Sequence, residues 1–211
     1  DVQGSFVGST ANGVQFGEQG NFSATNPQAP GLLTVNPNAL FFNQLKANGR
    51  ITNKSQANAG INPEGNETTG LRVPDGKSLL LVGGNINLDG GSLRAYEGNV
   101  ELASVSAPGS MGLDISGDTF GLNVPEDVER GDISIANESN ISIFGKFGGN
   151  IVINARNFEI SNSFIFAGTL KKEGNPDAQA GDININATDS ILIKDAAGID
   201  NSVYSQGNAG D

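Results

Sequence analysis

Short runs in which every second residue is apolar recur along this chain, and they constrain its fold more than any other feature. The clearest apolar pairs of this kind are Ile133/Ile135, Ile141/Ile143, Ile151/Ile153, Phe158/Ile160, Phe164/Phe166, Ile183/Ile185 and Ile191/Ile193. Alternation over three to five residues is typical of half-buried strands. Gly, Asn, Ser and Asp interrupt these runs every few residues, as residues of turns do. The pattern predicts an all-β chain, in which the longest helix-compatible stretch, residues 125–130, is about one turn.

The spacing of the predicted strands adds a repeat. Strands are expected to start seven residues apart, at Leu79, Ile86, Leu93 and Val100. Further along, similar strands open with Gly131-Asp132-Ile133, Gly149-Asn150-Ile151 and Gly181-Asp182-Ile183, at intervals of 18 and 32 residues. Short strands in units that repeat at this scale indicate a solenoid.

A parallel β-helix is the solenoid that fits this composition. Helical repeats conflict with the alternation, the Leu and Asn offsets of leucine-rich repeats are missing, and 6% aromatic residues are too few for a propeller. In a parallel β-helix, coils stack about 4.8 Å apart, and each face points apolar residues inward. The 30 Gly and 26 Asn can take the positive φ of sharp corners. We predict that Ile133, Ile151 and Ile183 stack directly on one another in successive coils.

Two segments are expected. Residues 1–77 are predicted to form irregular coils with extra-helical hairpins, and residues 78–211 regular coils continuous with them. In the first segment, residues 58–70 are predicted to be an exposed loop, and strands are predicted at residues 5–7, 14–16, 21–24, 32–35 and 40–42. In the second segment, a polar loop at about residues 171–179 is expected to project sideways, so that the coil resumes at Gly181.

Charge and composition exclude several functions. The net charge of −11 argues against binding nucleic acid or anionic lipid through a basic face. Cys and His are both absent, which removes thiolate and imidazole metal sites and Ser-His or Cys-His nucleophile pairs. No apolar run approaches the roughly 20 residues of a membrane helix. We therefore expect no enzymatic activity, no cofactor, no metal site, no nucleic-acid partner and no membrane insertion.

Several motifs follow one another in a fixed order over residues 4–105. They are GSFVGSTA (4–11), FSATNPQ (22–28), GLRVP (70–74), LLLVGGNI (79–86), GGSLRA (90–95) and VELASV (100–105). Together they resemble the secretion and haemagglutination-type domain of filamentous haemagglutinins, and the cyanobacterial branch most of all. The resemblance implies a right-handed parallel β-helix in an exoprotein that leaves a Gram-negative cell by two-partner secretion, through a dedicated outer-membrane transporter.

The same resemblance implies a secreted or cell-surface protein that serves adhesion or spacing, with a glycan or protein of a host or neighbouring cell as its partner. The family's Asn-Pro-Asn secretion motifs lie mostly upstream of the GSFV stretch. Residues 36–40, NPNAL, have similar letters but lie downstream of it, so transporter recognition is not assigned to them. The chain ends at Asp211, where another strand should follow, so further coils are expected in the parent protein.

Two motifs are candidate sites. Arg130-Gly131-Asp132 is a recognition tripeptide of the integrin-binding type, although Gly-Asp also recurs at 181–182 and 210–211 as a corner signature. An acidic stretch is favoured as a solvated loop and contains Asp114, Asp118, Glu126, Asp127 and Glu129.

Two alternatives to a structural adhesin remain open. A carbohydrate-active β-helix, a polysaccharide lyase or hydrolase, would use this acidic stretch with Arg130 as its basic residue. Such enzymes usually present aromatic platforms, and here Tyr96 and Tyr204 are the tyrosines that accompany the Phe residues. A trimeric fibre of the phage tailspike kind shares the repeats but not the order of the motifs.

Overall fold

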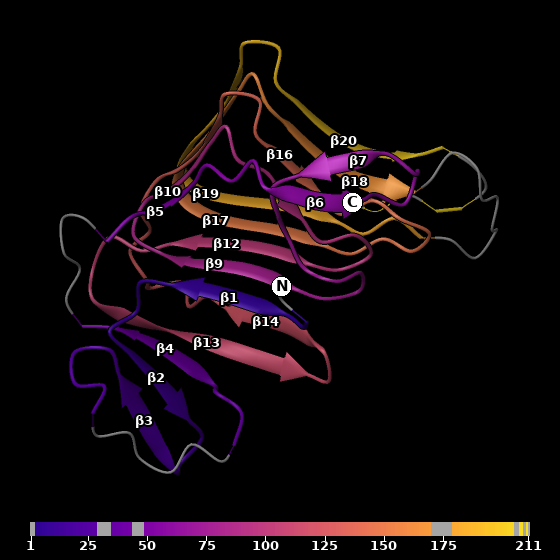
Figure 1. Ribbon diagram of the computed structural model, residues 1–211. Helices are drawn as coiled ribbons and strands as arrows, with labels where there is room; N and C mark the ends of the chain where they lie inside the picture. The colour runs from indigo at the N-terminus through magenta and orange to yellow at the C-terminus, as the bar shows by residue number, and fades with distance from the viewer. Residues whose placement is uncertain are drawn as a thin grey trace.

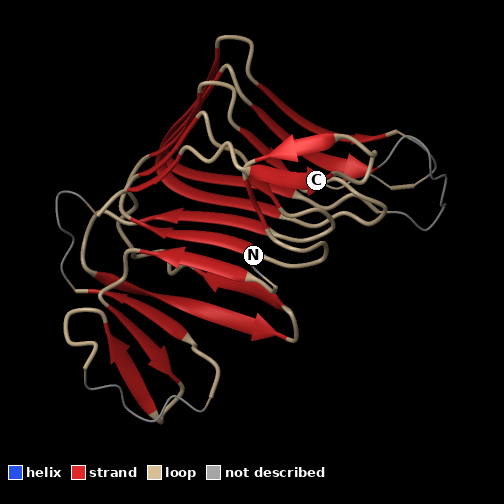
Figure 2. Cartoon of the chain, viewed as in Figure 1, coloured by secondary structure: helices blue, strands red, loops and turns tan. Residues whose placement is uncertain are grey.

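The computed structural model describes residues 3–28, 35–43, 49–169, 179–204, 207–208 and 210, which contain twenty strands and no helix (Figure 2). The loop predicted at 171–179 lies outside the described residues except for Gln179, and so does the predicted strand 32–35 except for Val35. Parallel strands are stacked into the body of the molecule, and an antiparallel sheet lies at one end of this stack (Figure 1).

Three columns of parallel strands form the body. The first column contains β1 (Phe6–Ser9), β9 (Leu79–Gly83), β12 (Val100–Ser104) and the first halves of β17 (Ile151–Ser161) and β19 (Ile183–Lys194). The second column contains β5 (Ile51–Asn53), β10 (Ile86–Asp89), β15 (Ile133–Ala136) and the second halves of β17 and β19. The third column contains β8 (Leu71–Arg72), β11 (Leu93–Arg94), β16 (Asn140–Ser142), β18 (Phe164–Thr169) and β20 (Gly198–Val203). Each coil of the chain passes through all three columns, which makes the arrangement β-helical.

Hairpins inserted into the coils account for their unequal lengths. Leu79 and Val100 pair in the first column and are 21 residues apart, whereas Val100 and its next partner, Ile151, are 51 apart. The longer coil carries the hairpin of β13 (Gly109–Ser116) and β14 (Thr119–Asn123). A second hairpin, β6 (Asn58–Ile61) with β7 (Glu67–Thr69), leaves the chain between β5 and β8.

Apolar side chains fill the interior between the columns. Leu79, Val100 and Ile151 follow one another in register in the first column and are fully buried. The corresponding buried rows are Ile86, Ile133 and Phe158 in the second column and Leu93, Ile141 and Ile165 in the third. Stacked aliphatic side chains of this kind are the main stabilising element, because each buries nearly all of its surface.

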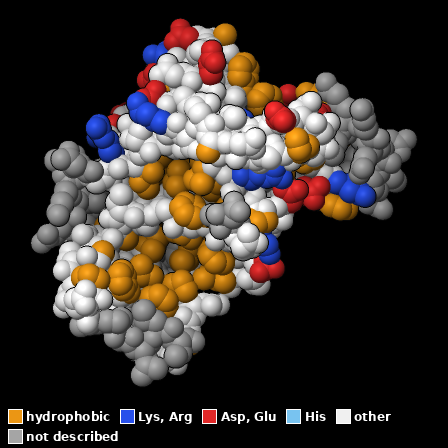
Figure 3. Space-filling view, viewed as in Figure 1, with side chains coloured by type: hydrophobic (Ala, Val, Ile, Leu, Met, Phe, Trp, Pro, Cys, Tyr) orange, Lys and Arg blue, Asp and Glu red, His pale blue; other side chains and the backbone are white. Residues whose placement is uncertain are grey.

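A second core lies on the outer side of the first column. The antiparallel sheet covers this side and has the strand order β14-β13-β4-β2-β3, with β2 at Gly13–Phe16, β3 at Gly20–Ser23 and β4 at Ala39–Phe42. Leu80 and Val82 of β9 pack there against Leu40, Phe42 and Met111. Because both faces of β9 are buried, its sequence is a continuous apolar run. Figure 3 shows hydrophobic side chains gathered around this region.

The four strand starts predicted seven residues apart, at Leu79, Ile86, Leu93 and Val100, are all confirmed. The predicted stacking of Ile151 on Ile183 is also confirmed. The prediction for Ile133 is wrong, because Ile133 lies in the second column between Ile86 and Phe158. The turns that precede the strands of the first and second columns have similar sequences. Similar local sequences therefore occur at positions that are not equivalent in the fold.

The corners explain that similarity. Where a coil enters the first column, the Asn150 backbone N–H donates to Asn99 Oδ1 (2.9 Å), and the Asp182 N–H donates to Asn150 Oδ1 (2.9 Å). Where a coil enters the second column, the Asp132 N–H donates to Asn85 Oδ1 in the same way (3.0 Å). Asn is therefore used at both corners, because its side-chain oxygen accepts a hydrogen bond from the backbone of the next coil.

Most of residues 58–70 are exposed, as predicted, but the prediction that they form a loop is wrong, because they contain the β6–β7 hairpin. Its strands are three and four residues long and mostly exposed. Their apolar side chains are Ala59 and Ile61, and this single alternation is too short to predict a hairpin.

Candidate functional site

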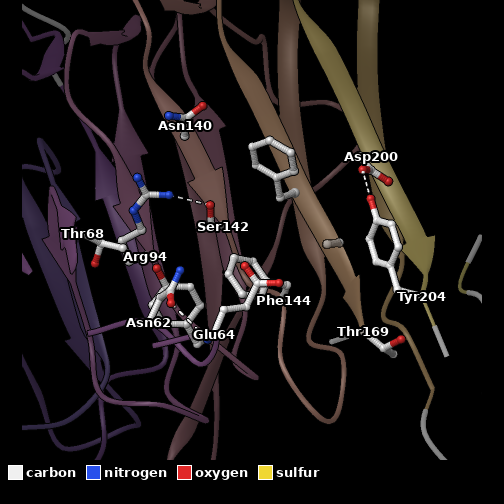
Figure 4. A pocket seen from close by; sticks show the side chains of 13 residues that line it. Asn62, Glu64, Thr68, Arg94, Asn140, Ser142, Phe144, Thr169, Asp200 and Tyr204 are labelled. Atoms are coloured by element: carbon white, nitrogen blue, oxygen red, sulfur yellow. Dashed lines mark hydrogen bonds between the residues drawn. The ribbon is translucent and has the colours of Figure 1, made fainter. Parts of the chain in front are cut away.

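A groove of about 330 Å³ lies on the outer face of the third column, with the β6–β7 hairpin along one side (Figure 4). Its volume falls at the lower end of the roughly 300–1,000 Å³ typical of small-molecule sites. The strands β11, β16, β18 and β20 supply its floor, and the hairpin supplies Asn62, Glu64 and Thr68.

The register of the third column aligns four side chains of the groove. Arg94 pairs with Ser142, Ser142 with Phe166, and Phe166 with Asp200. Successive strands are about 4.8 Å apart, so the row from Arg94 to Asp200 runs about 14 Å across the face. The groove therefore presents one residue from each of four successive coils in a straight line.

Aromatic rings line the middle of the groove. Tyr96 and Phe144 meet edge to face, with ring centroids 5.1 Å apart, and Phe166 stacks on the exposed Phe164 at 5.6 Å. Tyr96 and Thr169 are buried, and their hydroxyl oxygens have no hydrogen-bond partner among the described residues. Both oxygens are enclosed by the protein, so neither is accessible to a ligand in this structure.

Arg94 supplies a positive charge at one end. Its Nη1 donates to Ser142 Oγ (2.5 Å) and its Nε to the Thr69 carbonyl (3.3 Å), and both acceptors are uncharged. Among the described residues it forms no ion pair. Burial lowers the pKa of Arg94 from its ordinary value, while the nearby Tyr96 acts in the opposite direction. The guanidinium nevertheless stays charged, since arginine is not deprotonated in proteins.

Asp200 lies at the other end of the row. Its Oδ2 accepts from the Tyr204 hydroxyl (2.9 Å), and its Oδ1 accepts from the Ser202 N–H (2.9 Å) and the Ser202 hydroxyl. With a cation at one end, a hydrogen-bonded carboxylate at the other and aromatic rings between them, the groove is suited to binding a polar ligand that also has an apolar face.

The structure places the tripeptide Arg130-Gly131-Asp132 elsewhere, at the corner before β15. Arg130 Nη1 donates to the Asn186 carbonyl (2.9 Å). Asp132 accepts two hydrogen bonds from Arg156 (3.0 and 2.7 Å), which lower the pKa of its carboxyl group. Both charged side chains thus have partners within the coil stack, and recognition by this tripeptide stays a prediction.

The acidic stretch is divided between two places. Asp114 lies on β13, and Asp118, in the turn after β13, forms an ion pair with Lys77 (2.5 Å). Glu126, Asp127 and Glu129 are exposed in the loop before β15, where Arg130 and Arg156 line the same shallow depression. Within the described part of the chain, no three acidic side chains are grouped so that they could hold a metal ion.

The groove is not predicted from the sequence, although Tyr96 and Tyr204, the two tyrosines of the chain, both line it. The sequence contains one indication of the groove: because Leu93 is predicted to point into the core, alternation predicts that its neighbour Arg94 points outward. Its neighbours Ser142 and Asp200 come from other coils, and register across coils cannot be obtained from one sequence.

Comparison with known proteins gives one match. Residues 1–153 match the TPS secretion domain family, in which TPS stands for two-partner secretion. This match covers more than half of the chain. No curated protein and no solved structure matches it. None of the described residues belongs to a helix long and apolar enough to span a membrane.

Proposed function

Because the chain belongs to the TPS secretion domain family, we propose that it is a structural segment of a filamentous haemagglutinin-like adhesin of cyanobacterial type, held at the cell surface. Membership makes it a secreted exoprotein of a Gram-negative bacterium that is exported with an outer-membrane transporter. Adhesion, surface attachment and the haemagglutinin-like identity are the proposed parts. The observation that carries them is a stack of coils that continues through β18, β19 and β20, past the end of the family match.

The surface of these coils supports an adhesive or spacing role rather than catalysis. Outward side chains of neighbouring coils bond one another, as in Ser134 Oγ to Asn87 Oδ1 (3.0 Å) and Ser190 Oγ to Asn157 Oδ1 (2.7 Å). Such polar ladders keep the coils in register and leave a long, regular surface. Enzymatic activity would require reactive groups gathered at one place. We propose that this chain has no enzymatic activity.

We also propose that the coils wind in the right-handed sense. Nearly all connections between parallel strands of one sheet are right-handed, and the family-like motifs at residues 4–105 support the same hand. An experimental structure at a resolution that traces the main chain tests this directly, and left-handed winding would refute it.

The division at residue 77 is a further proposal, with residues 1–77 as irregular coils that continue into residues 78–211. The Phe6 N–H donates to the Ser78 carbonyl (2.8 Å), and the Ser78 N–H donates to Ser5 Oγ (2.9 Å). Because bonds cross the boundary, we expect a single cooperative unfolding transition. Two separate transitions in a denaturant titration would show that the segments are independent.

A secretion assay tests the proposed function. The chain is produced behind a cleavable export signal in a Gram-negative host, with and without an outer-membrane transporter of the two-partner secretion type. We expect the protein in the medium or on the cell surface only when the transporter is present. Beads coated with purified protein should then attach to cells of the producing species or of a neighbour. Equal release without the transporter would contradict export by this route, and unbound beads would contradict adhesion.

A further inference from the structure

The groove on the third column has no role in export, and its chemistry specifies a ligand. We propose that it binds an acidic oligosaccharide, whose carboxylate pairs with Arg94, whose ring lies against Phe144 and Phe166, and whose hydroxyls bond Asp200. This inference rests on the proposed adhesive function, because it names the class of molecule to which the adhesin would attach.

Arg94 is the residue that favours an acidic ligand. It is half-buried, and its two hydrogen-bond acceptors are neutral. Two carboxylates line the groove, but neither forms an ion pair with Arg94. Glu64 is exposed on the hairpin, and Asp200 lies three strand spacings away, about 14 Å. A planar guanidinium that is partly shielded from water is well suited to bind a carboxylate, to which it can donate two parallel hydrogen bonds.

The remaining groups suit a sugar. A sugar ring has apolar C–H faces, which aromatic rings cover, and hydroxyls at its edge, which need donors and acceptors. Phe144 and Phe166 are half-buried and supply the apolar surface. Asp200 supplies carboxylate oxygens, which can accept hydrogen bonds from these hydroxyls.

The length of the row favours an oligosaccharide over a single sugar. Arg94 and Asp200 are about 14 Å apart across four strands, and the groove between them is open to solvent along the β6–β7 hairpin. A ligand that touches both ends must therefore be extended. The hairpin side chains Asn62 and Thr68 lie where they can bond its outward edge.

Calorimetric titration of the purified chain tests the inference. The probes are tri-galacturonate, tri-mannuronate and 3′-sialyllactose, with maltotriose and lactose as neutral counterparts. We expect saturable binding of at least one acidic probe, and at least tenfold weaker binding of the neutral ones. Arg94→Gln should weaken the bound probe about tenfold or more, the effect of losing one charge-assisted contact of roughly 1.4 kcal/mol. Phe166→Ala should also weaken it.

Matched controls keep the result specific. Arg50→Gln and Phe147→Ala make the same kinds of change at exposed residues outside the groove and should leave affinity within about twofold. Should Arg94→Gln fail to fold, the methyl ester of the bound probe removes the charge from the ligand instead. The inference is overturned if no acidic probe saturates at millimolar concentration, or if esterification leaves affinity unchanged. Binding in solution is independent of export, so either result leaves the secretion assay to decide the proposed function separately.

Discussion

The Arg72 guanidinium lies over the Tyr96 ring, 4.9 Å from its centroid, and joins the β6–β7 hairpin to the third column. From this position Nη1 donates to the carbonyls of Ala59 and Ile61 (both 2.8 Å), and Nη2 pairs with Asp75 (2.9 Å). One side chain thus fixes the hairpin that borders the groove.

We expect Arg72→Gln to release the hairpin without unfolding the coils. Hydrogen bonds from a charged donor contribute about 1.5–3 kcal/mol each. Hydrogen exchange at residues 58–69 should therefore speed up about tenfold or more, because each 1.4 kcal/mol corresponds to a factor of ten. Mass spectrometry measures this, with Arg50→Gln as control. Exchange that accelerates equally in β12 and β17 would show instead that Arg72 supports the whole fold.

Truncation of the stacked core should be costly at either of two positions. Ile151 is fully buried between Val100 and Ile183, and Ile133 is almost fully buried between Ile86 and Phe158. Neighbours above and below cannot collapse into the space, so each change to Ala should cost about 2–5 kcal/mol in a denaturant titration. Ile61→Ala, at a side chain 53% exposed on the hairpin, should cost less than about 0.5 kcal/mol. Equal midpoints for Ile151→Ala and the parent protein would refute the stacking.

Gly181 should tolerate no side chain. A Cβ at this position would overlap the Gly149 carbonyl, because the two coils approach backbone to backbone at this corner. We expect Gly181→Ala to destabilise by at least the roughly 1–3 kcal/mol of an overpacked core. Gly4→Ala is the matched control, since a Cβ there meets nothing within 4 Å. If the two variants melt at the same temperature, the close corner is incorrect.

Glu101 should make stability depend on pH. It lies on β12 under the β13–β14 hairpin, where Oε2 accepts from the Leu122 N–H (2.8 Å). Burial raises the pKa of its carboxyl group above the ordinary 4.5, the Leu122 N–H opposes this shift, and Asp114 adds to it. Between 4.5 and the raised pKa, the folded state binds more protons than the unfolded state. This group's contribution to stability therefore falls as pH rises through that range.

Glu101→Gln keeps an acceptor for Leu122 and removes the charge. We expect this variant to be more stable than the parent protein at pH 7, and the difference to shrink as pH falls toward 4.5. Denaturant titrations at several pH values measure this difference, with the exposed Glu126→Gln as control. A difference that does not change with pH would show that Glu101 does not titrate as described.

Local features of the sequence are sufficient to predict where the strands lie but not which strands pair with one another. Leu79, Ile86, Leu93 and Val100 were placed correctly, because alternation and glycine corners are local properties. Ile133 was assigned to the wrong column, since the corners before Ile133 and Ile151 use the same Gly-Asp or Gly-Asn chemistry.

The groove could not be predicted for a related reason. Arg94 and Ser142 are 48 residues apart and are neighbours because β11 pairs with β16, across a coil that the β13–β14 hairpin lengthens. The length of an insertion does not reveal which strands it brings together. The β6–β7 hairpin, which completes the groove, has strands of three and four residues, which are too short to give a periodic signal.

The unequal pairing between coils has a mechanical consequence. Hydrogen bonds between coils run along the axis of the stack. A pull along that axis therefore places the same force on every layer of hydrogen bonds between two successive coils. Over all three columns, the described residues of the first and second coils pair at nine positions, whereas those of the fourth and fifth coils pair at sixteen. Under tension, the layer nearest Leu71 should part first, and the force that the molecule withstands is set by that layer and not by the number of coils.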